Sequence, residues 1–310
     1  MVGSELRAGF EKVAFKADDG TVLRGWHVPP QGDAPTAPIV VLHHGFSGLK
    51  ESYLDKYAAA FSAAGLGALV YDPRNFGESE GRVRQEIDPM QQLADYRDAI
   101  TFAMTLPRVD PRRLGAWGSS YGGGVAIQAA AIDQRIRCVA VQVSFLSGGA
   151  IWSHIPAETK AQLSQLFVGE RLARAAGEPP MTMQVVAQDP ATTPCILGTS
   201  DAYDWCMEAA KISPLWRNEV TVRSLELTFS FEPVAFLHRI APRPLMLIAA
   251  EGDMLMPIEA SREAFARAGE PKQFVSLPCG HFAPYVEHFE QSSSAARDWF
   301  RSHLLQTREA

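Results

Sequence analysis

Hydrophobic and polar positions along this chain follow two alternating patterns over most of its length. Short apolar runs, typical of strands buried on both faces of a parallel sheet, lie at 38–43, 67–71, 113–117, 137–143, 244–250 and 273–277. Stretches with helical spacing lie at 53–64, 88–106, 123–131 and 291–304. Two further strand patterns, 11–16 and 22–28, flank Asp19-Gly20, a pair typical of a hairpin turn. Strands that alternate with helices predict an α/β fold, with a mostly parallel sheet covered by helices on both faces.

One segment interrupts this alternation. Between Ser144 and about Leu237 the pattern contains no clear sheet strand, only short helical stretches and turns with many aromatic residues. Active sites of open α/β sheets lie at the carboxyl edge of the sheet, so we expect the insertion to form a lid there. The predicted division is an α/β core, 1–146 and 238–310, and a helical lid, 147–237. A separate helical domain is the alternative, less favoured because the sheet pattern resumes directly afterwards.

Composition narrows the functional classes. The chain has 310 residues, of which 46% are hydrophobic, and a net charge of −6. A negative net charge does not indicate the basic surface that nucleic-acid-binding proteins use. No apolar run reaches the ~18 residues of a membrane-spanning helix, and the first ten residues lack the apolar core of a signal peptide. We therefore expect a cytoplasmic protein that binds no nucleic acid and does not insert into a membrane.

The cysteines and histidines predict no metal or cofactor. Cys138, Cys195, Cys206 and Cys279 lack CxxC spacing, and the histidines lack ligand spacing. Cys138 and Cys279 lie in apolar strand contexts, so both are expected to be buried. A homodimer through lid or sheet-edge surfaces is compatible with the chain, but no pattern establishes it.

The most informative motif is Gly118-Ser119-Ser120-Tyr121-Gly122. A strand pattern precedes it and a helix of small residues follows, which places Ser120 at a sharp strand-to-helix turn. Such a turn holds the serine in a strained conformation, and the two glycines leave room for it. It also exposes the hydroxyl at a helix N-terminus, where developing negative charge is favoured. Ser120 is therefore the predicted nucleophile.

A serine nucleophile needs a histidine to take its proton and an acid to orient that histidine. In folds of this type the chain order is serine, acid, histidine. Asp253 follows the strand pattern 244–250, and His281 follows the last one, 273–277. We expect these two residues to complete the triad. Glu251 is the alternative acid.

The loop His43-His44-Gly45-Phe46-Ser47-Gly48 directly follows another strand pattern. It is expected to supply one backbone N–H of an oxyanion hole, and the residue after the nucleophile supplies the other. We assign these donors to Phe46 and Tyr121. The turn-rich segment 71–81 is expected to be structural, with Asp72 and Arg74 able to pair or cap near this loop.

With these residues in place, the chain resembles the α/β-hydrolase fold superfamily from about Phe15 to Leu304. The segments 71–81 and 115–123 are similar to dienelactone-hydrolase-like and cocaine-esterase-like enzymes. Three others, 44–51, 84–89 and 216–226, resemble the group that contains the fungal fumagillin-pathway polyketide transferase and its bacterial relatives. The resemblance implies a serine nucleophile with an Asp253–His281 relay that acts on an ester or thioester.

The predicted function is a serine hydrolase that cleaves a small-molecule carboxylic ester or thioester through an acyl-enzyme. An acyltransferase with an alcohol or amine acceptor would use the same triad and is the alternative. A C–C bond hydrolase also stays open, whereas a non-catalytic binding protein would have a damaged triad or oxyanion loop, and neither is seen. The lid aromatics indicate an apolar pocket, and Trp152, Trp205 and Trp216 are the predicted substrate-binding residues.

Overall fold

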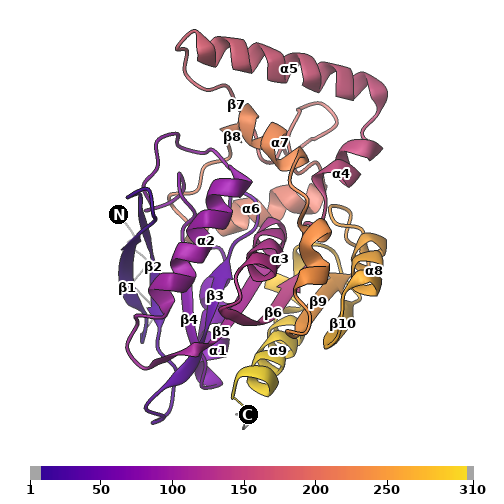
Figure 1. Cartoon of the computed structure of the whole chain (residues 1–310). Helices are drawn as coiled ribbons and strands as arrows, with labels where there is room; N and C mark the ends of the chain where they lie inside the picture. The colour runs from indigo at the N-terminus through magenta and orange to yellow at the C-terminus, as the bar shows by residue number, and fades with distance from the viewer. Residues whose placement is uncertain (1–7, 306–310) are drawn as a thin grey trace.

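The computed structural model describes residues 8–305 and contains one large sheet (Figure 1). In spatial order its strands are β1 (Glu11–Lys16), β2 (Val22–Val28), β4 (Gly67–Tyr71), β3 (Ala37–His43), β5 (Val109–Ser119), β6 (Ile136–Gln142), β9 (Leu245–Ala250) and β10 (Lys272–Leu277). The strands β1 and β2 pair antiparallel at one edge, and the other six run parallel to one another. The predicted α/β fold with a mostly parallel sheet is confirmed.

Helices cover both faces of this sheet, which explains why its central strands are continuously apolar. One face packs against α2 (Pro89–Ala103), α3 (Tyr121–Ile132) and α8 (Ile258–Arg267), and the other against α1 (Leu54–Ala63) and α9 (Phe289–Phe300). Along β3, Ile39 and Val41 belong to the first core, whereas Val40 and Leu42 belong to the second. Successive side chains of a strand point to opposite faces, so every residue of β3 is buried.

The chain between β6 and β9 contains the segment 147–237, called the insertion below. Its elements are α4 (Gly148–His154), α5 (Ala157–Ala175), β7 (Thr182–Met183), α6 (Ser200–Ile212), β8 (Val220–Thr221), α7 (Val222–Phe229) and the 3-10 helix η1 (Pro233–Arg239). None of them joins the large sheet, and β7 and β8 pair only with each other. The expectation of only short helices was wrong, because α5 has 19 residues. Figure 1 shows α5 as the helix farthest from the sheet.

The insertion packs mainly against the core and only partly against itself. Val186, Ala202, Val220 and Phe231 belong to the same buried cluster as α2 and α3. A smaller separate cluster forms around Phe167 in α5 and includes residues of α7. Most of the insertion therefore shares the core of the sheet.

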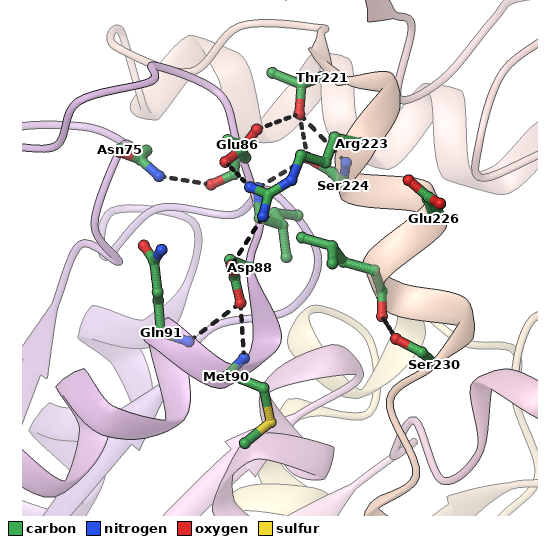
Figure 2. Close-up of polar contacts among 12 residues, drawn as sticks. Asn75, Glu86, Asp88, Met90, Gln91, Thr221, Arg223, Ser224, Glu226 and Ser230 are labelled. Carbon is green, nitrogen blue, oxygen red and sulfur yellow. Dashed lines mark hydrogen bonds and ion pairs between the residues drawn. The ribbon is translucent and has the colours of Figure 1, made fainter. Parts of the chain in front are cut away.

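Polar contacts also join the insertion to the loop before α2 (Figure 2). The backbone N–H of Ile87 donates to Ser224 Oγ at 2.8 Å, and that of Thr221 donates to the carbonyl of Gln85 at 2.9 Å. Ser224 lies in the first turn of α7, next to Arg223, which pairs with Glu86. Two segments that the sequence analysis treated separately, 84–89 and 216–226, thus form one contact.

One local expectation was wrong. Cys138 is buried in β6 as predicted, but Cys279 is only half-buried because it lies in the turn after β10 and not in the strand. Asp72 and Arg74 each form an ion pair: Asp72 binds Lys50 at the end of the loop after β3, and Arg74 binds Asp95. No helix within residues 8–305 combines the length and the apolar character that crossing a bilayer requires.

Candidate active site

Ser120 occupies the sharp turn between β5 and α3. Its backbone angles are φ 54° and ψ −125°, a conformation that costs free energy in any residue with a side chain. A Cβ added to Gly122 would lie 2.3 Å from the carbonyl oxygen of His44, and one added to Gly118 would lie 2.1 Å from that of Gly122. The two glycines are therefore required by close backbone approach, and the turn sets Ser120 beside the loop that follows β3.

The structure brings the three predicted side chains together at the carboxyl ends of β5, β9 and β10. His281 Nε2 lies 3.0 Å from Ser120 Oγ, and His281 Nδ1 lies 2.7 Å from Asp253 Oδ2. A carboxylate only accepts, so Nδ1–H donates to Asp253 and Nε2 is left to accept the serine proton. The other carboxylate oxygen of Asp253 accepts the backbone N–H groups of Leu255 at 2.9 Å and Met256 at 2.7 Å.

Glu251, the alternative acid, lies elsewhere. Its carboxylate accepts a hydrogen bond from Ser276 Oγ at 2.7 Å on the exposed side of the sheet end. Asp253 and His281 are both buried. The orienting position beside the imidazole is therefore filled by Asp253.

The loop after β3 passes directly over the serine. Gly45 approaches so closely that an added Cβ would lie 3.2 Å from Ser120 Cβ. Phe46 lines the cavity next to Ser120 and packs edge-on against the buried ring of Tyr121, with 6.0 Å between centroids. Tyr121 is the first residue of α3, so its backbone N–H is one of the free donors of a helix N-terminus. The two predicted oxyanion donors thus belong to neighbouring segments beside Ser120.

A buried ion cluster fixes the far end of this loop. Lys50 is fully buried, and its ammonium lies 2.7 Å from Glu51, 2.7 Å from Asp72 and 2.9 Å from Glu78. Burial alone would lower the pKa of Lys50, but the carboxylates of Asp72 and Glu51 raise it above its usual value. The three carboxylates could otherwise hold a metal ion, but the lysine ammonium already occupies the space between them. The cluster ties the loop to the end of β4.

Two histidines of the same loop are neutral. Burial lowers the pKa of His43 and that of His44 to about 4. His44 Nε2 donates to the carbonyl of Ser52 at 2.8 Å, and its ring stacks on Tyr285. Both side chains therefore act as packing and hydrogen-bonding groups of the loop.

Ser120 and His281 line a small cavity of about 30 Å³. A water needs roughly 10–15 Å³ on this measure, so the cavity has room for a few waters and not for an acyl chain. Cys206 lines it too, but burial raises the pKa of its thiol to about 12, which leaves it a poor nucleophile. A substrate therefore requires side chains around this cavity to move.

Of the three predicted substrate-binding tryptophans, Trp205 and Trp216 line this cavity. Trp205 stacks on Phe282, and Trp216 Nε1 lies 3.4 Å from Ser47 Oγ. The prediction for Trp152 was wrong, because Trp152 packs edge-on against Phe229 within the separate cluster of the insertion.

Leu197 and Phe282 are among the lining residues that the sequence interpretation missed. Phe282 directly follows His281, and that adjacency could have indicated it. Leu197 lies in an irregular stretch without a pattern.

Comparison with known proteins identifies the family of this chain. A thiohydrolase of Eupenicillium brefeldianum is 33% identical over 299 residues, which cover 95% of this chain and 92% of that protein. A polyketide transferase of Stachybotrys chlorohalonatus is 32% identical over 270 residues, with 86% and 87% covered. The crystal structure of the alpha/beta hydrolase GrgF from Penicillium superimposes with a TM-score of 0.83 at 26% identity, covering 96% of this chain and 99% of GrgF. The model of the Alpha/beta hydrolase family matches residues 40–292, and the chain belongs to that family.

Proposed function

We propose that this protein is a serine hydrolase that cleaves a carboxylic thioester or ester through an acyl-enzyme. The observation that carries the proposal is the hydrogen-bonded chain from Ser120 through His281 to Asp253 at the wall of a cavity. A thioester is the favoured substrate class because a relative 33% identical to this chain is named a thiohydrolase.

In the proposed reaction, Ser120 Oγ attacks the acyl carbon while its proton passes to His281 Nε2. Asp253 holds the imidazole in the tautomer that can accept this proton and stabilises the imidazolium that results. The backbone N–H groups of Phe46 and Tyr121 bind the oxyanion, each worth ~10²–10³ in turnover. The C–S or C–O bond then breaks, and the leaving group takes the proton from His281. Water then attacks the acyl carbon of the acyl-enzyme, again with His281 as the base, and the carboxylic acid is released.

We further propose that the insertion, 147–237, acts as a lid over this site. Trp205 and Trp216 of the insertion close the cavity against the loop after β3. A cavity of about 30 Å³ is far below the ~300–1,000 Å³ of ligand pockets. Substrate entry therefore requires these two side chains, and the segments that carry them, to move away from Ser120.

Acyl transfer is the second candidate function. It is favoured by the relative named a polyketide transferase, and by walls that leave room for few waters beside Ser120. An alcohol or amine would then replace water in the second half of the reaction, with His281 again removing the proton.

The test is release of thiol or alcohol from acyl thioesters and p-nitrophenyl esters of increasing chain length, with and without an added alcohol. The wild type should release product, and Ser120→Ala should lose at least ~10³-fold in kcat. Intact mass spectrometry should detect an acylated wild-type enzyme and no acylated Ser120→Ala variant. Equal turnover by the two proteins would refute the assignment of the nucleophile. A new ester formed from the added alcohol would assign acyl transfer.

A further inference from the structure

A buried hydrogen bond joins the segment of His281 to the residue before the proposed nucleophile. The hydroxyl of Tyr285 donates to Ser119 Oγ at 2.5 Å, and both residues are buried. Tyr285 is the last residue of the 3-10 helix η2 (Ala283–Tyr285), which begins two residues after His281. Ser119 is the last residue of β5 and directly precedes Ser120. One bond therefore connects the chain that carries the proposed base to the strand that carries the proposed nucleophile.

The sheet does not align these two segments directly. The strands β6 and β9 lie between β5 and β10 (Figure 1), so the main-chain ladder links β5 to β10 only through two other strands. Ser120 also has a backbone conformation that persists only when surrounding contacts hold it. Contacts beyond the ladder must therefore help to keep Ser120 Oγ and His281 Nε2 at the observed 3.0 Å.

Tyr57 of α1 supports the same connection. Its hydroxyl donates to the carbonyl oxygen of Pro284 at 2.7 Å and lies 2.9 Å from Gln142 Oε1. Gln142 ends β6, and its backbone carbonyl accepts the N–H of Ser120 at 2.9 Å. Tyr57 and Gln142 are fully buried, and hydrogen bonds are stronger in a buried environment of low dielectric. The network therefore holds η2 against the ends of β5 and β6.

The ring of Tyr285 contacts two other parts of the site. It stacks on His44 of the loop after β3, with 6.2 Å between centroids, and lies 5.1 Å from the ring of Trp205 in the insertion. Tyr285 also lines the cavity of Ser120. Burial raises the pKa of the Tyr285 hydroxyl above its usual value, so the group stays protonated and able to donate. The ring thus packs in the wall of the site, and the hydroxyl binds Ser119.

We propose that Tyr285 is a positioning residue, whose hydroxyl acts through Ser119 to align Ser120 Oγ with His281 Nε2. This inference rests on the proposed attack by Ser120, and it applies to hydrolysis and to acyl transfer because both begin with that attack. Small displacements of reacting groups lower the rate of a reaction steeply. Loss of the Tyr285–Ser119 bond should therefore lower kcat and leave substrate binding intact.

The test is Tyr285→Phe, which removes the hydroxyl and keeps the ring. With p-nitrophenyl esters, kcat should fall about tenfold, the effect of losing one hydrogen bond, and KM should stay as in wild type. The rate at which a fluorophosphonate probe labels Ser120 should fall by the same factor, because labelling needs the same attack. Ser119→Ala removes the other partner of the bond and should have the same effects.

The double variant Tyr285→Phe/Ser119→Ala separates positioning from stability. Each single substitution leaves one buried hydroxyl without this partner and should lower the denaturant midpoint. The double variant removes both hydroxyls and should regain part of that loss. Its kcat should nevertheless stay about tenfold below wild type, because the two substitutions break the same bond.

Tyr96→Phe is the matched control. Tyr96 is fully buried in the core on the other face of the sheet, and its hydroxyl donates to the carbonyl oxygen of Val41 at 2.7 Å. The substitution also removes one buried phenol hydroxyl. It should lower the denaturant midpoint about as much as Tyr285→Phe does, and leave kcat and the labelling rate as in wild type.

Three results would overturn the positioning role and leave the assignment of Ser120 intact. These are a wild-type kcat in folded Tyr285→Phe, a loss of about a hundredfold in the double variant, which is the product of two independent effects, and an equal loss of kcat in Tyr96→Phe. Failure of the wild type to cleave any ester or thioester would instead refute the proposed function itself.

Discussion

Arg223, in the first turn of the insertion helix α7, forms an ion pair with Glu86 in the loop that leads into α2 (Figure 2). The same guanidinium lies 3.6 Å from a carboxylate oxygen of Asp88. Asp88 in turn caps α2 by accepting the backbone N–H groups of Met90 and Gln91. One arginine thereby connects the proposed lid to the N-terminus of a core helix.

Replacing Arg223 by Met should therefore loosen α7 from the core. Glu86 is almost fully buried, so loss of Arg223 removes its charged partner and leaves its carboxylate with the Thr221 hydroxyl at 3.4 Å. We expect the free energy of unfolding to fall by about 1–3 kcal/mol, and the segment 147–237 to become more sensitive to limited proteolysis. Denaturant titration and protease digestion measure these effects.

The matched control is Arg171→Met. Arg171 pairs with Glu226 on the exposed side of the same helix, and its side chain is 61% exposed. Exposed ion pairs contribute about 0–1 kcal/mol, so this variant should unfold and digest like wild type. Equal behaviour of the two variants would mean that the Glu86–Arg223 pair does not hold the insertion.

Asp253→Asn should reduce kcat by roughly 10⁴-fold with little change in folding. An amide at this position can donate to His281 Nδ1 and so favour the wrong imidazole tautomer, although it still accepts from Leu255 and Met256. Glu251→Gln, two residues away, should retain nearly full activity because the Glu251 carboxylate bonds to Ser276, whereas His281 Nδ1 bonds to Asp253. Steady-state kinetics of both variants decide between the two acids. A larger loss in Glu251→Gln would contradict the proposed relay.

The positions of these residues could be predicted because the sheet imposes them. In a parallel sheet all carboxyl strand ends meet at one edge, so Ser120, Asp253 and His281 could be placed together from three strand patterns and their chain order. The loop that follows β3 could be placed at the same edge by the same argument. The glycines around Ser120 were informative because close backbone contact excludes any side chain there.

The insertion could be predicted far less well. Its helices pack by tertiary contacts without a repeating strand pattern, so the 19-residue α5 was missed, and Trp152, which packs in the separate cluster of the insertion, was predicted to bind substrate. Ser119 and Tyr285 lie 166 positions apart in the sequence, and no local pattern links them. The partners of Asp72 and Arg74 also come from other segments, so the sequence could indicate a structural role for the two residues but could not name Lys50 and Asp95 as their partners.

The two buried histidines predict sensitivity to acid. In the unfolded chain an imidazole binds a proton below about pH 6.5, whereas in the folded protein burial lowers the pKa of His43 and His44 to about 4. The unfolded state therefore binds more protons between these values, and the stabilising contribution is complete above pH 6.5 and is lost as the pH falls toward 4. Each histidine should contribute up to about 1.4 kcal/mol per pH unit in this window.

Denaturant titrations from pH 4.5 to 8 measure this slope. His43→Gln should reduce the slope of stability against pH by the contribution of one histidine, because the glutamine side chain does not titrate. His238→Gln replaces an exposed histidine and should leave the slope as in wild type. A wild-type stability that stays constant down to pH 4.5 would rule out this contribution from the neutral pair.

Two glycine-to-alanine substitutions should have opposite effects. In Gly122→Ala the new Cβ would lie 2.3 Å from the carbonyl oxygen of His44 and 2.4 Å from that of His43. These are backbone atoms, so the loop carrying Phe46 must move away from Ser120, at a cost of about 1–3 kcal/mol or more. We expect lower stability together with a loss of kcat of at least ~10²-fold, since the oxyanion donor is displaced.

Gly169→Ala is the counterpart. Gly169 lies inside the long helix α5, and an added Cβ would meet no atom within 4 Å. Alanine is favoured over glycine in a helix by about 1 kcal/mol, so this variant should be slightly more stable than wild type with unchanged kcat. Thermal unfolding and steady-state kinetics measure both pairs of effects. If Gly122→Ala kept full activity, the close approach of the β3 loop would not be what positions the oxyanion donor.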